Sequence, residues 1–407
     1  MIRILDHKDA APLLARKAER LDEAERVVRP ILEDVRRRGD AALLEYARKF
    51  DGFEGTSVRV EPSGTLDAEF ERAVSVAAAN IREYACLQLP QERFVEHGDG
   101  RRLGQIVRPL ESMGAYTPAG RYPLPSTLLM NVIPAQVARV KTICVACPHP
   151  SREILALANW LGVTHFFCMG GAQAIAAIAY GTETVPRVDR IVGPGNIYVA
   201  AAKKIVAGQT GIDFVAGPTE IVIIAADGNG RWISADMLAQ AEHDTDASAI
   251  LLTTSRKLAE AVARELERQL ETLPTAAVAR QSIENNGAIV IVDSLEHAVE
   301  FSNALAPEHL ALHDPSLLGF VQNAGSVFLG PMSPEAAGDY ASGPNHVLPT
   351  SGAARFRGGL SAADFVKVIS VQELSPEALE RLTPAITTLA RAEGLEAHAR
   401  SVEARRE

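Results

Sequence analysis

The chain has 407 residues, of which 47% are hydrophobic and 23% charged. This balance is typical of a globular protein, and the length predicts two or three domains. The formal net charge of −10 argues against a nucleic-acid partner, because such a surface needs a concentrated basic patch. The first residues lack an apolar signal segment, and glycines and a histidine interrupt the longest uncharged run, 154–182. We therefore expect a cytoplasmic protein with no membrane segment.

The first 90 residues are expected to be helical, and few of their side chains are suited to catalysis or ligand binding. Apolar residues recur at helical spacing from Leu13 to Val35, and the pattern stops at Gly39. A second helix is expected over 66–89.

From residue 105 onward, strand patterns alternate with helix patterns. Buried strands are expected in the runs MGAYTP, TICVAC, THFFCM and RIVGPGN, with helices at 126–140, 152–161, 171–180 and 197–208. A second series has strands at 221–225, 249–253, 288–293, 309–313 and 326–330. This alternation predicts parallel, doubly wound sheets that are covered by helices on both faces.

Two of the four cysteines, Cys144 and Cys147, have the spacing of a redox or zinc-binding pair. They lie in the apolar run TICVAC, which favours plain strand packing with every second residue buried.

Two glycine-rich turns, 169–173 and 192–196, each follow a strand and open a helix. Ligands of such sheets bind at the carboxyl ends of strands, where helix N-termini present free N–H groups to phosphates. Gln173 and Asn196 could bind a pyrophosphate or a ribose. Neither turn is a G-x-G-x-x-G fingerprint, and no partner acid follows at the expected distance. A dinucleotide site and turns that only reverse the chain both stay open.

The second series carries side chains suited to metal or proton chemistry. Gln240 and His243 lie at i and i+3 near a helix end, where they could share a metal or form an ordinary polar face. Glu308 and His309 adjoin at a loop-to-strand boundary, and a loop can aim both at one pocket. Histidine suits general-base work near neutral pH.

Further candidates lie in the last seventy residues. The segment 338–350 is rich in Gly, Pro and Asn, which predicts a long functional loop that carries Asp339 and His346. Glu393 and His398 belong to a charged helical tail, where a histidine usually lies in solvent.

Several long motifs closely resemble the histidinol dehydrogenase family. They are GAQAIAAIAYG at 171–181, GPTE at 217–220, QAEH at 240–243, APEHL at 306–310 and GDYASGPNHVLPT at 338–350. They occur in unbroken order within the stretch from Tyr116 to His398, which is more specific than any one motif. The resemblance implies an NAD-linked, zinc-dependent enzyme of histidine biosynthesis. Such an enzyme oxidises L-histidinol through bound histidinal to L-histidine and consumes two NAD.

The resemblance also implies residue roles. One Zn²⁺ per subunit would be held by Gln240, His243, Asp339 and His398. The catalytic pair would be Glu308, which activates water for the aldehyde step, and His309, which takes the hydroxyl proton. The substrate contacts would be Thr219, Gln240, His243, His309, Asp339, His346, Glu393 and His398. The residues near NAD would be Tyr116, Gln173 and Asn196. The tail would cross to the partner of a homodimer, so that Glu393 and His398 complete the neighbour's site.

We expect two Rossmann-like α/β domains plus small helical parts, in an intertwined homodimer. The expected division is 1–13 with 361–385 as a small helical domain, 14–115 with 220–360 as the α/β domain of the metal site, 116–219 as the NAD-side domain and 386–407 as the tail. Two residues depart from the family pattern: Ala119 stands where glycine is usual, and Tyr122 stands where a small residue is common. The N-terminus is also somewhat short for the family.

Three other functions stay open. One is a related dehydrogenase on the same scaffold, acting on another amino- or sulfonate-bearing alcohol. Another is a zinc hydrolase with Glu308 as the base. The third is a non-catalytic metal-binding assembly protein, which would leave the Glu308–His309 pair without a purpose.

Overall fold

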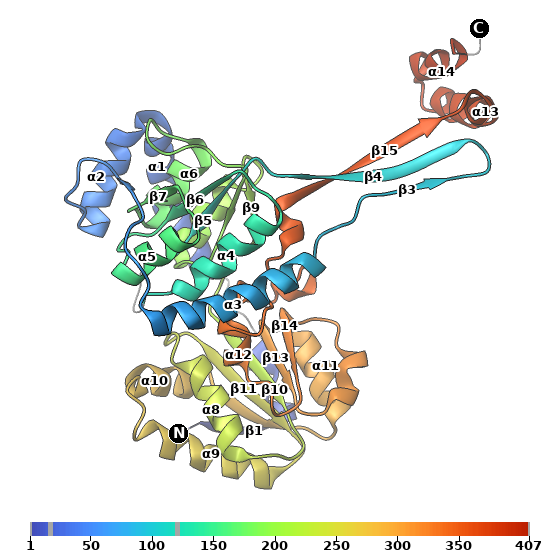
Figure 1. Cartoon of the computed structure of the whole chain (residues 1–407). Coiled ribbons are helices and arrows are strands. Elements are labelled where there is room, and N and C mark those ends of the chain that lie inside the picture. The colour runs from blue at the N-terminus through green and yellow to red at the C-terminus, as the bar shows by residue number, and fades with distance from the viewer. Residues whose placement is uncertain (1, 15–18, 119–122, 406–407) are drawn as a thin grey trace. The chain divides into compact units, whose positions relative to one another are not determined.

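The computed structural model describes residues 2–14, 19–118 and 123–405, which fall into two compact units (Figure 1). Unit 1 comprises residues 1–88 and 110–365, and unit 2 comprises residues 89–109 and 366–407. Unit 1 contains two six-stranded sheets and unit 2 one three-stranded sheet. The mixed α/β fold with parallel sheets is therefore as predicted.

The first sheet of unit 1 is doubly wound. Its order is β2 (Arg59–Val60), β7 (His165–Phe167), β6 (Thr142–Ala146), β5 (Ser112–Tyr116), β8 (Arg190–Val192) and β9 (Gly211–Ile212). All neighbours pair in parallel except β2 and β7. The chain order reverses between β5 and β8, and the crevice at the carboxyl ends of such a pair is where ligands of open α/β sheets bind.

Helices cover this sheet. One core gathers α1 (Glu19–Arg38), α2 (Asp40–Asp51), α6 (Gly171–Tyr180) and α7 (Ile197–Val206) with strand residues such as Phe167. Elsewhere α4 (Pro125–Val137) packs on β5, on α5 (Arg152–Trp160) and on α3 (Ala68–Leu87). Helix α6 is almost wholly apolar because neighbours surround it, and all but its two end residues are buried.

The second sheet is entirely parallel. Its order is β1 (Arg3–Asp6), β12 (Ala288–Ile291), β11 (Ser248–Thr253), β10 (Glu220–Ile224), β13 (His309–Leu312) and β14 (Ser326–Leu329).

Alternate residues of its central strand β10 face opposite cores. Ile221 and Ile223 pack with α8 (Gly230–Ala241), α9 (Arg256–Leu270) and α10 (Ala276–Asn286), whereas Val222 and Ile224 pack with α11 (Leu295–Leu305). Burial of each such side chain contributes about 1.5–3 kcal/mol, so this strand is a rigid base for the residues at its ends.

Short 3₁₀ helices complete unit 1: η1 (His7–Asp9), η2 (Ala11–Leu14), η3 (Pro315–Phe320), η4 (Ala353–Arg355) and η5 (Ala362–Phe365).

Three local predictions differ from the structure. Residues 3–6 form a strand instead of a helix, because they extend the second sheet beside β12. Helix α2 follows Gly39 directly, where no helix was predicted, because the positive φ of that glycine turns the chain without a long loop. Asp339 lies on a short helix, α12 (Glu335–Tyr340), rather than in the predicted loop. Six residues with an internal glycine are too few to show a helical period.

Unit 2 is an antiparallel sheet of order β15 (Val366–Leu374), β4 (Arg101–Pro109) and β3 (Arg93–Glu96), followed by α13 (Pro376–Ala392) and α14 (Glu396–Glu403), which pack on each other. Ser375 caps α13, since its hydroxyl accepts the N–H of Ala378 at 3.2 Å. The helical tail is as predicted, but 366–374 is a strand. The predicted four-part division of the chain stays a prediction. Among the described helices of both units, none is long and apolar enough to cross a membrane.

Cys144 and Cys147 are both buried, so the expectation that only every second residue of this run is buried was wrong. Strand β6 lies between β5 and β7, and both of its faces are covered. All four thiols are free, and burial raises the pKa of Cys144 and of Cys147 to about 12. This supports packing over redox chemistry.

We predict that iodoacetamide at pH 8 labels exposed Cys86 in the native protein and leaves Cys144 and Cys147 unlabelled. Only the thiolate reacts, and a pKa of about 12 leaves little thiolate at that pH. Mass spectrometry of digests measures the labelling, with urea-unfolded protein as the control in which all four cysteines react. Rapid native labelling of Cys144 or Cys147 would show that the strand opens.

Candidate active site

The predicted catalytic residues meet at the amino edge of the second sheet. Glu308 directly precedes β13, His309 begins it, and Thr219 directly precedes β10, with Ile221 paired to His309. Helix α8 returns from the carboxyl edge, so Gln240 near its end reaches the same place. The site thus lies at the edge opposite to the one where open α/β sheets usually bind ligands.

Glu308 is the centre of a buried hydrogen-bond chain. Its Oε2 accepts the hydroxyl of Thr219 at 2.5 Å and the backbone N–H of Glu220 at 3.0 Å. The Thr219 hydroxyl in turn accepts Nε2 of Gln240 at 2.8 Å. Burial raises the pKa of Glu308 to about 8, although both hydrogen bonds oppose this by favouring the carboxylate.

His309 is held as a neutral base. Its Nδ1 lies 3.2 Å from the carbonyl oxygen of Glu220, which fixes the tautomer with the proton on Nδ1. Its Nε2 is buried, has no hydrogen-bond partner within the described residues, and lies 3.8 Å from Oδ1 of Asp339. Burial lowers the pKa of His309 to about 4. The Nε2 lone pair is therefore available to take a proton at neutral pH.

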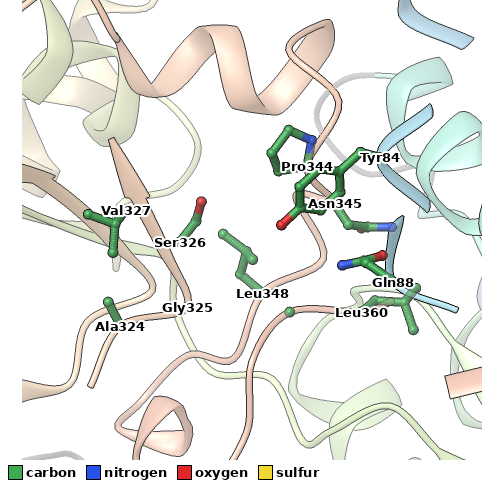
Figure 2. A pocket seen from close by; sticks show the side chains of 11 residues that line it. Tyr84, Gln88, Ala324, Gly325, Ser326, Val327, Pro344, Asn345, Leu348 and Leu360 are labelled. Atoms are coloured by element: carbon green, nitrogen blue, oxygen red, sulfur yellow. The ribbon is translucent and has the colours of Figure 1, made fainter. Parts of the chain in front are cut away.

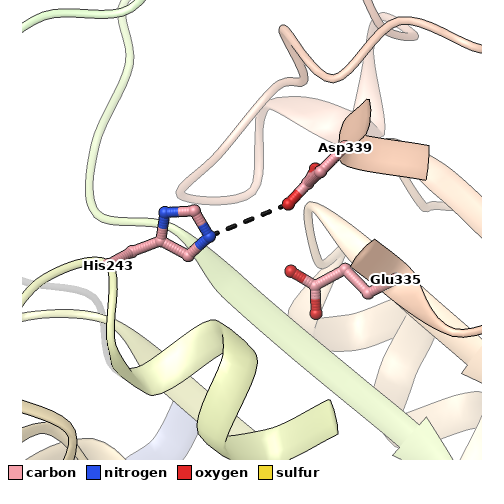
Figure 3. Close-up of side chains that lie close together, drawn as sticks. All are labelled: His243, Glu335 and Asp339. Atoms are coloured by element: carbon pink, nitrogen blue, oxygen red, sulfur yellow. Dashed lines mark ion pairs between the residues drawn. The ribbon is translucent and has the colours of Figure 1, made fainter. Parts of the chain in front are cut away.

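A metal-capable group faces this base (Figure 3). Nε2 of His243 lies 3.7 Å from Oδ2 of Asp339, and with Glu335 these residues offer ligand atoms that all lie within 4.8 Å of one another. The buried Oε1 of Gln240 has no hydrogen-bond donor within the described residues. A buried carbonyl oxygen without a donor, next to an imidazole and a carboxylate, fits a cation with N and O ligands.

Two members of this group, His243 and Asp339, favour each other's charged forms. The nearby carboxylate of Asp339 raises the pKa of His243, whose side chain is 45% exposed. Burial works against ionisation of Asp339, but His243 and the other imidazoles outweigh it and lower the pKa of that carboxyl. Asp339 is thus held as a carboxylate, the form that binds a metal.

Glu335 is a site residue that the sequence reasoning missed. Its side chain is buried, and neither carboxyl oxygen has a hydrogen-bond partner within the described residues. Its Oε1 lies 3.8 Å from Nδ1 of His309. Burial, with the neighbouring Asp339 and Glu308, raises the pKa of Glu335 well above its usual value. The signal was the i, i+4 spacing of Glu335 and Asp339, which places both on one face once a helix is assumed.

His346 joins the two sheets of unit 1. Its Nδ1 lies 2.8 Å from the carbonyl oxygen of Asp339, and its Nε2 lies 3.3 Å from the hydroxyl of Thr127, in the first turn of α4. Burial lowers the pKa of His346. Because α4 follows the carboxyl end of β5, the metal-capable edge of the second sheet meets the carboxyl edge of the first.

Two of the predicted cofactor residues share one network at that carboxyl edge. Tyr116 ends β5, and its hydroxyl accepts the N–H of Gly171 at 3.1 Å. Gln173 donates from Nε2 to Asp51 at 3.1 Å, and Asp51 also accepts the N–H of Gly170 at 3.1 Å. An acid therefore does lie at this turn, contributed by the end of α2. No local sequence pattern pointed to it, because it precedes the turn by more than a hundred residues.

Asn196, the third predicted cofactor residue, follows β8 and is exposed. Its Oδ1 accepts the N–H groups of Tyr198 and Val199 at 3.0 and 3.1 Å and so caps α7. This leaves its Nδ2 group to donate to a ligand. Tyr116, Gln173 and Asn196 follow three strands of one parallel sheet.

The remaining predicted residues lie elsewhere. Glu393 is the C-cap residue directly after α13 and His398 lies on α14, and both are exposed and belong to unit 2. All the other predicted site residues belong to unit 1. Ala119 and Tyr122 lie outside the described residues.

A separate hollow in unit 1 shares no residue with this site (Figure 2). It lies between the end of α3, the start of β14 and the segment after α12, with Gln88, Ser326 and Leu348 among its lining residues. Tyr84 is its only ionisable side chain. It offers no acid–base pair.

Comparison with known proteins identifies the family. Residues 14–406 match the sequence profile of the family described as histidinol dehydrogenase. The chain belongs to the histidinol dehydrogenase family. A histidinol dehydrogenase of Geobacillus kaustophilus is 50% identical over 403 residues, which cover 95% of each chain. That of Bacillus thuringiensis is 48% identical over 97% of this chain and 95% of its own.

A solved structure agrees with this family. The crystal structure of histidinol dehydrogenase from Elizabethkingia anophelis superposes with a TM-score of 0.92 at 36% identity, covering 99% of this chain and 98% of that one. The predicted family is thus confirmed, and the chain is a dehydrogenase of the oxidoreductase class.

We predict that Glu308→Gln weakens the pH dependence of stability in the metal-free protein. Unfolding returns the carboxyl to water and to a pKa near 4.5, so between pH 4.5 and 8 the unfolded state binds fewer protons than the folded state. The free energy of unfolding then falls as pH rises, by up to about 1.4 kcal/mol per pH unit from this group. Glutamine does not titrate, so the free energy of unfolding of the Glu308→Gln variant should fall less steeply with pH than that of the wild type.

Urea unfolding of chelator-treated protein across this pH range measures both slopes. Equal slopes in the wild type and in Glu308→Gln would mean that the carboxyl is already ionised in the folded protein.

Proposed function

We propose that this enzyme oxidises L-histidinol to L-histidine through histidinal, with two NAD, in the last steps of histidine biosynthesis. The observation that carries the proposal is the buried Glu308–His309 pair opposite the group of His243 and Asp339, in a chain of this family. We place this biosynthetic reaction in the cytoplasm.

A zinc ion fits the second half of the site. Gln240, His243 and Asp339 would hold it, with His398 as the fourth ligand. The buried, partnerless Oε1 of Gln240 supports this ligand set, as does the nearness of His243 to Asp339. When bound, zinc supplies a fixed positive charge that accepts N and O ligands and has no redox chemistry of its own.

The first oxidation needs a base at the hydroxyl of histidinol. His309 would take the proton on Nε2, and NAD, when bound, would supply the acceptor for the hydride from the carbinol carbon. The resulting imidazolium would have its Nε2 3.8 Å from Oδ1 of Asp339, whose carboxylate would stabilise it. The carbonyl oxygen of Glu220 keeps the ring in the orientation that presents Nε2.

The second oxidation needs water added to the aldehyde. Glu308 is suited to remove a proton from that water, because a carboxyl with a pKa of about 8 is far more basic than an ordinary one. Thr219 and the N–H of Glu220 hold the acceptor oxygen in place. A buried site also keeps the reactive aldehyde from escaping between steps.

The remaining predicted site residues would bind the substrate or NAD. Thr219, His346 and Glu393 would contact the substrate, and Tyr116, Gln173 and Asn196 would contact NAD. The hydrogen bond between His346 and Thr127 joins the two sheets that carry these groups.

We further propose a homodimer in which unit 2 of one subunit completes the site of the other. Several large apolar side chains of unit 2 are exposed, including Leu389 at 65% and Val368 at 50%. Exposed apolar residues gathered in one small unit indicate a surface that another chain covers. Glu393 and His398 are exposed on this unit and so are accessible to a partner.

The function is tested by NADH formation from L-histidinol with zinc present. We expect two NADH for each histidinol consumed, measured by absorbance against substrate loss. One NADH per histidinol would mean that the aldehyde is released. No NADH from histidinol, with turnover of another amino- or sulfonate-bearing alcohol, would favour the related dehydrogenase instead.

We predict that His309→Ala removes the first oxidation, whereas Glu308→Gln slows chiefly the second. Removal of a general base costs about 10²- to 10⁴-fold in rate. Single-turnover kinetics with histidinol and then with histidinal separate the two steps. Equal losses of both steps in Glu308→Gln would contradict the division of labour.

A further inference from the structure

A buried ion pair lies beneath the predicted cofactor turn 192–196. Nζ of Lys203, on α7, pairs with Oδ1 of Asp213, which directly follows β9. The two residues are only 2% and 4% exposed. A buried pair of this kind is often no more stable than two apolar side chains of the same volume. Stability alone therefore does not account for this pair.

Asp213 Oδ1 also accepts the N–H of Phe214, and two further hydrogen bonds of the pair converge on one residue of the turn, Gly193. Nζ of Lys203 donates to the carbonyl oxygen of Gly193 at 3.0 Å. Oδ2 of Asp213 accepts the N–H of the same glycine at 2.8 Å. Both backbone polar groups of Gly193 are thus held by buried, charged side chains, which make stronger hydrogen bonds than neutral groups.

Gly193 in turn determines how closely the turn after β8 approaches the end of β5. Its φ of +110° and its packing exclude a side chain, because a Cβ would lie 2.1 Å from the carbonyl oxygen of Tyr116. The turn therefore rests directly on the end of β5. Three residues later Asn196 caps α7, the helix that carries Lys203.

We propose that the Lys203–Asp213 pair is a positioning device for the cofactor. It holds the turn 192–196 against the end of β5, so that Asn196 and Tyr116 reach the same dinucleotide. This inference rests on the proposed use of NAD. Neither Lys203 nor Asp213 touches the cofactor, since both are buried. An apolar pair would fill the same space but could not hold Gly193 at both its N–H and its carbonyl oxygen.

The test replaces the pair by apolar residues of similar volume, Lys203→Met together with Asp213→Leu. Binding of NAD to the zinc-loaded dimer is measured by equilibrium dialysis, which needs no histidinol. We expect the Kd for NAD to rise about 10- to 100-fold, the cost of a small misplacement of binding groups. KM for NAD should rise likewise, whereas KM for histidinol, zinc content and Tm stay near the wild-type values.

A neighbouring lysine on the same helix provides the control. Lys204 pairs with Glu25, and its side chain is 45% exposed. Lys204→Met therefore loses an ion pair on α7, and NAD binding should be unchanged. If the double variant fails to fold, Gly193→Ala is used instead, since its Cβ would push the turn from Tyr116 while the ion pair stays intact.

The outcomes separate the two proposals. An unchanged Kd for NAD in the folded double variant, or in Gly193→Ala when that variant is used, overturns the positioning role. An equal loss in Lys204→Met also overturns it, because any weakening of α7 would then suffice. Wild-type protein that binds NAD but does not oxidise histidinol contradicts the proposed function and leaves the positioning role standing.

Discussion

The structure depends on one constraint, that buried backbone groups at the end of a strand need partners. At the amino edge of the second sheet, Glu308 accepts the N–H of Glu220 and His309 approaches its carbonyl oxygen. The backbone N–H and carbonyl oxygen of one β10 residue thus hold the two adjacent side chains at the start of β13, the neighbouring strand in the sheet. At the carboxyl edge of the first sheet, Lys203 and Asp213 hold Gly193 in the same manner. In each sheet, the side chains that bond to backbone groups at the strand ends are therefore held in fixed positions next to the predicted site residues.

The same burial shifts the pKa values of the two predicted catalytic residues in opposite directions. Removing a carboxyl from water disfavours its charged form, so the pKa of Glu308 rises to about 8. Removing an imidazole from water also disfavours its charged form, so the pKa of His309 falls to about 4. Burial of these two adjacent residues thus places a carboxyl of raised basicity beside a neutral imidazole. Asp339 remains ionised there because His243 faces it.

Much of this was predictable from the sequence, because apolar runs and glycine turns determine the parallel sheets, and long motifs identify the family. The adjacency of Glu308 and His309 left their roles open, and the family resemblance implied them; the structure buries both at the amino edge of one sheet. What escaped prediction depends on contacts between distant segments. Glu335 was hidden in a helix too short to show a period, and Asp51 reaches its turn from a helix far earlier in the chain. Residues 3–6 were taken as helical because an edge strand is specified by the neighbouring strand β12, not by its own four residues.

We propose that the site of unit 1 is completed by unit 2 of a partner subunit. Co-expression of His309→Ala with His398→Ala tests this most directly, since each variant alone lacks one half of every site. If the site is shared, mixed dimers regain one intact site. The mixture then recovers about a quarter of wild-type histidinol oxidation, because random pairing makes half of the dimers mixed. Recovery of no activity, with mixed dimers demonstrated by differently tagged subunits, would show that each subunit builds its site alone.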